Sequence, residues 1–135
     1  MANAYTPTSE TRTVAICGGY TATDDSDLYR FAYDLGVLLA RGGFEVLNGG
    51  YDGTMVAACK GARDAGGRTI GITCPSELRS ARGAISPNLF LDEEYPAPDI
   101  LARINVIMRL SGGYVFLDGG TGTLSELGLT WEFVS

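Results

Sequence analysis

The stretch that decides the fold runs from Ser111 to Trp131 and reads SGGYVFLDGGTGTLSELGLTW. Its first part, residues 113–117, is a short apolar run rich in aromatic residues, which predicts a buried β-strand. A turn with three glycines and two threonines follows at 118–123, and a helix is expected to open at Leu124. A strand, a glycine turn and a helix start present backbone N–H groups and the positive helix end to an anion such as a phosphate. Taken alone, the stretch also fits a tight turn that binds nothing.

The composition narrows the class of protein. The chain has 135 residues, enough for one domain, and 10 Lys and Arg against 16 Asp and Glu give a net charge of −6. This acidic balance disfavours nucleic-acid binding. The absence of histidine argues against Ser-His-Asp triads and most metal sites, so we expect no metal.

The cysteines and the N-terminal residues indicate the cellular compartment of the protein. Cys17, Cys59 and Cys74 are odd in number and lie in apolar surroundings, which indicates reduced core thiols in a cytoplasmic protein. No apolar run approaches a membrane span, and the first residues lack a signal-peptide pattern. We expect residues 1–11 to be flexible and residues 12–135 to form one domain.

The rest of the chain alternates between short apolar runs and amphipathic segments. Strands are expected at 13–17, 44–48, 68–74, 88–91 and 113–117, and helices at about 26–41, 54–65 and 99–110 and from 124 onwards. This alternation predicts an α/β fold, a Rossmann-like parallel sheet of about five strands with helices on both faces. We expect the strand order 3-2-1-4-5. Phe31 and Leu38 are expected on the buried face of the first helix, and the polar loop between Pro75 and Pro87 is long enough to be a lid or rim.

Glycine-rich turns follow three of the predicted strands. They contain the candidate ligand-binding and phosphate-binding residues Gly18, Gly19, Gly49, Gly50, Gly53, Thr54, Gly119, Gly120, Thr121, Gly122 and Thr123. In a parallel sheet these turns share the carboxyl edge, so they predict a pocket that holds a phosphorylated ligand against backbone amides. An ordinary NAD site is disfavoured, because the first turn lacks the GxGxxG pattern and Asn48 stands where an acidic residue would close the second strand.

Two charged residues are placed near the same edge. Arg103 lies in the first turn of its helix, about a quarter-turn from the apolar face, and Glu126 lies about one turn into the last helix. Both can reach the mouth of the predicted pocket. Each also has a plainer interpretation, because Glu126 can stabilise a helix dipole and Arg103 can form a surface ion pair. The acids at 92–94 are expected to be solvated charges.

Together these residues resemble the Lonely Guy family, long mislabelled as lysine decarboxylases. The family motif PGGxGTxxE is matched by DGGTGTLSE at 118–126, and GGYDGTM at 49–55 is similar to the family's GGxxGxM segment. Further matches are Gly61-Ala62, residues 65–67 and Thr130-Trp131, which are similar to the family's GA, AGG and TW. Arg103 falls where the family carries the arginine of its M-x-x-R-K segment. The resemblance covers nearly the whole chain from Val14.

This resemblance implies hydrolysis of the N-glycosidic bond of a nucleoside 5′-monophosphate to a free base and ribose 5-phosphate. Glu126 and Arg103 would be the catalytic pair, the turn at 119–123 would bind the 5′-phosphate, and no cofactor would be required. The resemblance also implies a homodimer or higher homo-oligomer, and a further strand and helices beyond Ser135.

The chain departs from the motif at two positions. Asp118 replaces the motif proline and places an acid beside the phosphate turn, and Ile104 replaces the lysine after the arginine. The resulting Arg-Ile-Asn sequence is closer to relatives that bind a nucleotide-like or pterin cofactor without cleaving it, including molybdenum-cofactor carrier proteins. The intact Glu126 favours the enzyme. The alternative is a binding or carrier protein for a phosphorylated cofactor such as molybdenum cofactor, and a nucleotide-sensing module is a weaker third option.

Overall fold

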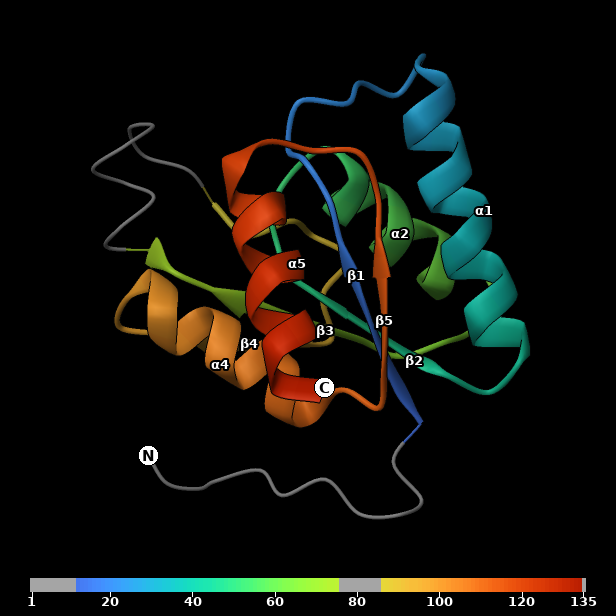
Figure 1. The fold of residues 1–135 in the computed structure, drawn as a ribbon. Coiled ribbons are helices and arrows are strands. Elements are labelled where there is room, and N and C mark those ends of the chain that lie inside the picture. The colour runs from blue at the N-terminus through green and yellow to red at the C-terminus, as the bar shows by residue number, and fades with distance from the viewer. Residues whose placement is uncertain (1–11, 76–85, 135) are drawn as a thin grey trace.

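The computed structural model describes residues 12–75 and 86–134 (Figure 1). These residues form β1(Thr13–Cys17), α1(Asp27–Arg41), β2(Glu45–Asn48), α2(Thr54–Asp64), β3(Thr69–Thr73), β4(Glu93–Pro96), α4(Ile100–Leu110), β5(Gly113–Phe116) and α5(Thr121–Val134). All neighbouring strands run parallel, which confirms the predicted α/β, Rossmann-like sheet of five strands. The flexible segment expected at 1–11 and most of the loop expected between Pro75 and Pro87 lie outside the described residues.

The predicted strand order was wrong. The observed order is β4-β3-β2-β1-β5, so the fourth strand lies outside β3 and the fifth pairs with β1. The fourth strand is also formed by 93–96 rather than by 88–91. Residues 88–91 form a turn instead, because the Asn88 side chain accepts a hydrogen bond from the Phe90 amide at 2.9 Å, as is typical of Asn in turns. The corrected order places the glycine turns after β1 and β5 next to each other.

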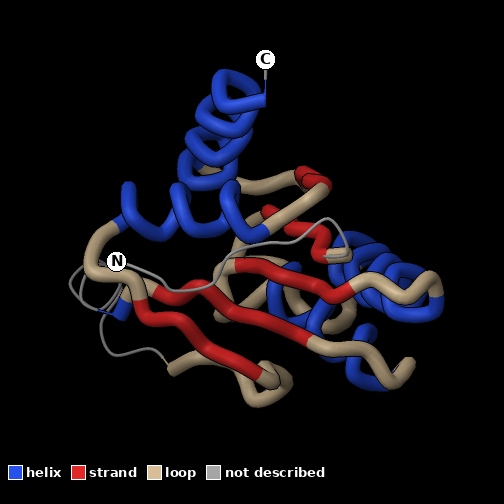
Figure 2. The backbone as a smooth tube through the Cα atoms, turned by 90° about the horizontal axis from the view of Figure 1, so that it is seen from below, coloured by secondary structure: helices blue, strands red, loops and turns tan. Residues whose placement is uncertain are grey.

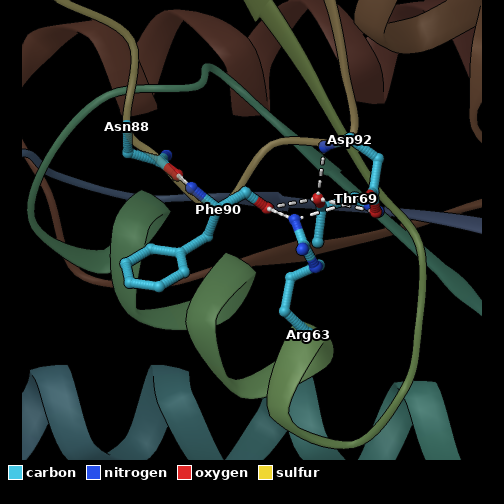
Figure 3. A network of polar contacts seen from close by, with 5 residues as sticks. All are labelled: Arg63, Thr69, Asn88, Phe90 and Asp92. Carbon is cyan, nitrogen blue, oxygen red and sulfur yellow. Dashed lines mark hydrogen bonds and ion pairs between the residues drawn. The ribbon is translucent and has the colours of Figure 1, made fainter.

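A polar network holds the segment before β4 against the start of β3 (Figure 3). The Thr69 amide donates to Asp92 Oδ2 at 2.8 Å, and the Asp92 amide donates to the Thr69 carbonyl at 3.0 Å. Arg63 pairs with Asp92 at 3.3 Å and donates to the Phe90 carbonyl at 3.4 Å. Glu94, within β4, accepts from Thr73 Oγ1 at 2.7 Å. These acids were expected to be only solvated, but they have structural partners on β3 and α2.

Helices cover both faces of the sheet, as predicted. On one face α4 packs over a core that includes Leu47, Ile72 and Ile107, and on the other α1 and α2 pack over Ile16 and Val46. Figure 1 shows α5 beside α4, and Figure 2 shows the strands as one twisted layer between helical segments. None of the helices in the described ranges is long and apolar enough to cross a membrane.

The contact between α1 and α2 is made by small residues. A Cβ added at Gly36 would overlap the Ala58 carbonyl oxygen, and one at Gly61 would lie 2.9 Å from the Tyr33 carbonyl carbon. The two helix backbones therefore touch. Because this crossing is so narrow, Phe31 and Leu38 lie outside it with 58% and 64% of their surface exposed, so the expectation that they are buried was wrong.

Candidate functional site

The glycine turns after β1, β2 and β5 meet at the carboxyl edge of the sheet. The Gly19 amide donates to the Asp118 carbonyl at 3.3 Å, which joins the turn of β1 to the turn of β5. The Gly19 carbonyl accepts from the amide and the hydroxyl of Thr54, each at 3.0 Å, which joins the same turn to the start of α2. Most of the predicted ligand-binding residues are thus brought to one edge.

Several of these glycines are required by the fold itself. Gly53 precedes α2 with a φ of +66°, and its Cβ would lie 2.5 Å from the Gly19 carbonyl oxygen. A Cβ at Gly119 would lie 2.7 Å from the Gly19 amide nitrogen, and one at Gly18 would overlap Thr54 Oγ1. Their identity is therefore explained by close packing between turns, whether or not a ligand binds there.

Gly120 differs from its neighbours. A Cβ built on it meets no atom within 4 Å, and its φ lies outside the positive range that favours glycine. It precedes Thr121, where α5 begins; the helix therefore starts before Leu124, the expected position. Among the described residues no close contact explains glycine at 120, and this open position directly precedes the start of α5.

Gly50 has a structural role in the turn after β2. It has a φ of +82°, its amide donates to Asn48 Oδ1 at 2.9 Å, and its carbonyl accepts from the Asn88 amide at 2.9 Å. Asn48 is fully buried and also donates to the Met55 carbonyl at 3.1 Å and to Cys59 Sγ at 3.3 Å. The Asn48 side chain, which the sequence analysis noted only as a departure from an NAD site, therefore stabilises the turn after β2.

Arg103 enters the carboxyl edge from the first turn of α4. Its Nε donates to the Ile72 carbonyl at 2.7 Å and its Nη2 donates to the Gly49 carbonyl at 2.9 Å, so it bridges the ends of β3 and β2. Its guanidinium carbon lies 5.7 Å from the centre of the buried Tyr51 ring. A Cβ at Gly49 would lie 2.8 Å from Met55 Sδ and would overlap Arg103 Nη2. The guanidinium is therefore a fixed charge rather than a surface ion pair.

Glu126 lies in the second turn of α5. It is partly buried, and its ionisation is coupled to Arg103 and to Cys17 at the end of β1. Burial raises the pKa of Glu126 above its ordinary value, and the positive charge of Arg103 and, to a smaller extent, the Cys17 thiol offset part of this rise. Burial, and secondly the negative charge of Glu126, raise the pKa of Cys17 strongly, so its thiol stays protonated.

The two departures from the motif have clear positions. Ile104 is 4% exposed and packs in the interior, so position 104 supplies no charge to the edge. Asp118 is exposed beside the turn, and Asn105 faces solvent, where it accepts from Arg109 Nε at 2.9 Å. Within 12–75 and 86–134, no group of three or more His, Cys, Asp or Glu side chains is arranged to hold a metal ion.

Sequence reasoning placed Arg103, Glu126 and the glycine turns at one edge but missed two members of the cluster. Cys17 was interpreted as a core thiol, although its position directly before a glycine turn indicated the carboxyl edge. Tyr51 was treated as part of the turn, yet it is 1% exposed and its hydroxyl accepts from the Cys74 amide at 3.1 Å. Its place next to Gly50 gave no signal of burial.

Comparison with known proteins identifies the family. Residues 11–133 match the sequence profile of the SLOG cluster4 family. The chain belongs to this family. An uncharacterised protein of Archaeoglobus fulgidus is 33% identical to this SLOG cluster4 member over 105 residues, which are 78% of this chain and 65% of that protein.

A second relative carries a named activity. The pyrimidine/purine nucleotide 5′-monophosphate nucleosidase of Escherichia coli K12 is 30% identical over 125 residues, 87% of this chain and 26% of the nucleosidase. The chain thus spans about a quarter of that relative.

Two solved structures share the fold. The molybdenum cofactor binding protein of Rippkaea orientalis superposes with a TM-score of 0.79 at 30% identity, covering 94% of this chain and 74% of that one. The molybdenum cofactor carrier protein of Chlamydomonas reinhardtii gives a TM-score of 0.76 at 26% identity, covering 93% and 74%. The SLOG cluster4 chain is therefore similar both to a nucleotide-cleaving enzyme and to cofactor-binding proteins.

Proposed function

We propose that this SLOG cluster4 protein hydrolyses the N-glycosidic bond of a nucleoside 5′-monophosphate, releasing a free base and ribose 5-phosphate. The observation that carries the proposal is the partly buried Glu126 carboxylate, held beside the fixed charge of Arg103 at the edge where the glycine turns meet. The similarity to a nucleotide 5′-monophosphate nucleosidase over 87% of this chain supports it.

Glu126 has the chemistry that the reaction requires. Cleavage of an N-glycosidic bond passes through a ribosyl cation, so a nearby carboxylate stabilises the developing charge and orients or deprotonates the attacking water. Burial raises the pKa of Glu126 and makes it a stronger base, while the Arg103 charge favours the ionised form and offsets part of the rise. Arg103 acts chiefly through charge, because its Nε and Nη2 already donate to backbone carbonyls.

The start of α5 suits a 5′-phosphate. The first amides of a helix lack partners within the helix and carry its positive dipole end. The open approach at Gly120 leads to these amides, about one turn before Glu126 in the same helix. Binding the phosphate there would place the sugar carbon close to the carboxylate, so that phosphate binding energy contributes to positioning for attack.

The direct test is turnover. The protein is incubated with a panel of nucleoside 5′-monophosphates that includes AMP, CMP and N6-prenylated AMP, and free base and ribose 5-phosphate are measured. We expect release from at least one substrate and a loss of at least about a thousandfold in Glu126→Gln, since the reacting carboxylate is gone. No release from any member by the folded protein would refute the proposal for these substrates.

The phosphate subsite has a separate test with a matched control. Gly120→Ala and Gly128→Ala both add one methyl group where no atom lies within 4 Å, so neither disturbs packing. We expect Gly120→Ala to raise KM for the nucleotide at least about tenfold, because the methyl group keeps the phosphate off the amides. Gly128→Ala is expected to leave KM unchanged. Equal KM values in the two variants would place the phosphate elsewhere.

A second candidate is a carrier for a phosphorylated cofactor such as molybdenum cofactor. It is favoured by the buried Ile104 in place of the motif lysine, and by the likeness to a molybdenum cofactor binding protein at a TM-score of 0.79. Native mass spectrometry of the protein purified from a cofactor-producing host tests this candidate. A bound pterin mass without turnover of any nucleotide would favour the carrier.

Two further expectations accompany the proposal. We place the protein in the cytoplasm, because Cys17, Cys59 and Cys74 are buried free thiols. Assembly as a homodimer or higher homo-oligomer stays a prediction, which sedimentation would test.

A further inference from the structure

The Tyr51 side chain crosses from the turn after β2 to the end of β3. It is 1% exposed, and its hydroxyl accepts a hydrogen bond from the Cys74 amide at 3.1 Å. At the backbone end of the residue, the Tyr51 carbonyl accepts from Asn88 Nδ2 at 3.1 Å. A buried ring that is bonded at its tip and at its backbone has little freedom to turn, so its faces point in fixed directions.

Tyr51 and Arg103 join β2 to β3 beyond the point where their backbone ladder ends. The last pair of the ladder sets Asn48 opposite Gly71, an offset of 23 residues that Tyr51 and Cys74 repeat. Gly49 and Ile72 have the same offset, and their carbonyls accept from Arg103 at 2.9 Å and 2.7 Å. The hydrogen bond between Tyr51 and Cys74 therefore helps to set the distance between the two carbonyls that anchor Arg103.

The guanidinium of Arg103 lies close to the Tyr51 ring. Its carbon is 5.7 Å from the centre of the ring, within the range of about 6 Å over which an aromatic face attracts a cation. Because the ring is buried, this attraction is stronger than at an exposed site. Three uncharged groups, the ring and two backbone carbonyls, thus hold the guanidinium.

The lack of charge on these three groups preserves the charge of Arg103. Among the residues that the structure describes, no acidic side chain forms an ion pair with Arg103. A carboxylate in place of the ring would also hold the guanidinium, but it would cancel its positive charge. An aromatic face attracts the cation and leaves its net charge in place. The positive field of Arg103 therefore acts on the carboxyl edge of the sheet.

We propose that Tyr51 is a positioning residue, whose buried ring holds the Arg103 guanidinium at the carboxyl edge without neutralising it. The hydrogen bond from the Cys74 amide fixes the ring in turn. The importance of Tyr51 for turnover rests on the proposed hydrolase function, whereas its effect on Arg103 does not.

The experiment observes the Arg103 side chain directly. In protein labelled with ¹⁵N-arginine, the Arg103 Nε–H signal is assigned by its loss in Arg103→Lys, and its hydrogen exchange with solvent is measured by NMR. Tyr51→Leu removes the ring, and Tyr51→Phe keeps the ring but removes the hydroxyl. Tyr114→Leu is the control, since it removes a tyrosine ring that packs against the core on the face covered by α4. If Tyr51→Leu fails to fold, Tyr51→Met takes its place, because methionine adapts to irregular space.

We expect Nε–H exchange to be at least about tenfold faster in Tyr51→Leu, the scale of one buried contact between a cation and an aromatic ring. It should be at most about threefold faster in Tyr51→Phe, which loses one hydrogen bond between uncharged groups, and unchanged within about twofold in Tyr114→Leu. With an active substrate, kcat should fall about tenfold in Tyr51→Leu while KM stays within about twofold, and Tyr51→Phe should retain most of kcat.

Three results would overturn the inference. They are unchanged Nε–H exchange in folded Tyr51→Leu or Tyr51→Met, exchange in Tyr51→Phe that is as fast as in Tyr51→Leu, and an equal acceleration in Tyr114→Leu. The failure of the hydrolase proposal is distinguishable, because absence of turnover in the unmodified protein leaves the exchange rates informative.

Discussion

The contact between α1 and α2 makes one substitution destabilising where helix propensity alone predicts the opposite. Gly36 lies inside α1, and replacing glycine by alanine within a helix normally stabilises a protein by about 1 kcal/mol. At Gly36, however, the added methyl group would overlap the Ala58 carbonyl oxygen and lie 3.0 Å from its carbon. Because the obstacle is backbone, no rotamer change relieves it, and the helices must move apart.

The magnitude follows from these two opposed effects. Overpacking of this kind costs up to about 3 kcal/mol, so Gly36→Ala should destabilise the protein by about 2 kcal/mol net. For a chain of this size, that corresponds to a fall in Tm of roughly 6–8 °C. Gly128→Ala is the matched control, since it lies inside α5 with no atom within 4 Å of the added carbon. It should raise Tm by about 3–4 °C.

Circular dichroism at 222 nm, followed during heating and during urea unfolding, measures both variants. The reasoning predicts shifts of opposite sign for the same chemical change. If Gly36→Ala were as stable as the unmodified protein, or if both variants shifted in the same direction, the close backbone contact would not control this crossing.

Three further predictions concern the carboxyl edge. Glu126→Gln should gain stability relative to the unmodified protein as pH rises above about 4.3, the ordinary glutamate pKa, because a carboxyl with a raised folded-state pKa then loses the stabilisation due to proton binding. A pH-independent difference in urea unfolding would contradict this. Asn48→Leu should lower the free energy of unfolding by about 3 kcal/mol, because the Gly50 amide and the Met55 carbonyl lose their buried partner. An unchanged midpoint of urea unfolding would refute this prediction. Asp118→Asn should tighten AMP binding, measured by calorimetry, about two- to fivefold at low salt and less at high salt, because it removes an exposed acid next to the proposed anion site. A gain in affinity that persists at high salt would contradict this electrostatic explanation.

Much of the fold was predictable because local patterns determine it. Apolar runs bounded by glycine turns located β1, β2, β3 and β5, and amphipathic periodicity located the helices. The position of β4 was not predictable, because Glu93 and Glu94 form an edge strand whose polar side chains pair with Arg68, directly before β3, and with Thr73 on β3. Strand order failed for a related reason: which neighbour a strand pairs with depends on long-range packing that no local pattern records.

The candidate site was predictable to the level of its charged side chains and turns. Arg103 and Glu126 could be placed from their positions along helices, and the glycines from their places after strands. The carbonyls of Ile72 and Gly49 that hold Arg103 could not be foreseen, because backbone acceptors leave no mark in the sequence. The electrostatic interaction of Cys17 with Glu126 could not be foreseen, because an isolated core thiol and a core thiol near a carboxylate look the same in one sequence.

The bridge that Arg103 makes also constrains how the two positions can vary. Any side chain at Gly49 would displace the Nη2 group, which ties the ends of β2 and β3 together. Residues 49 and 103 are separated by more than fifty positions in the chain, but we expect substitutions at them to covary. A relative that carries alanine or serine at 49 should also have lost the arginine at 103. In an engineered library that varies both positions together, some double variants should fold although each of the corresponding single variants does not.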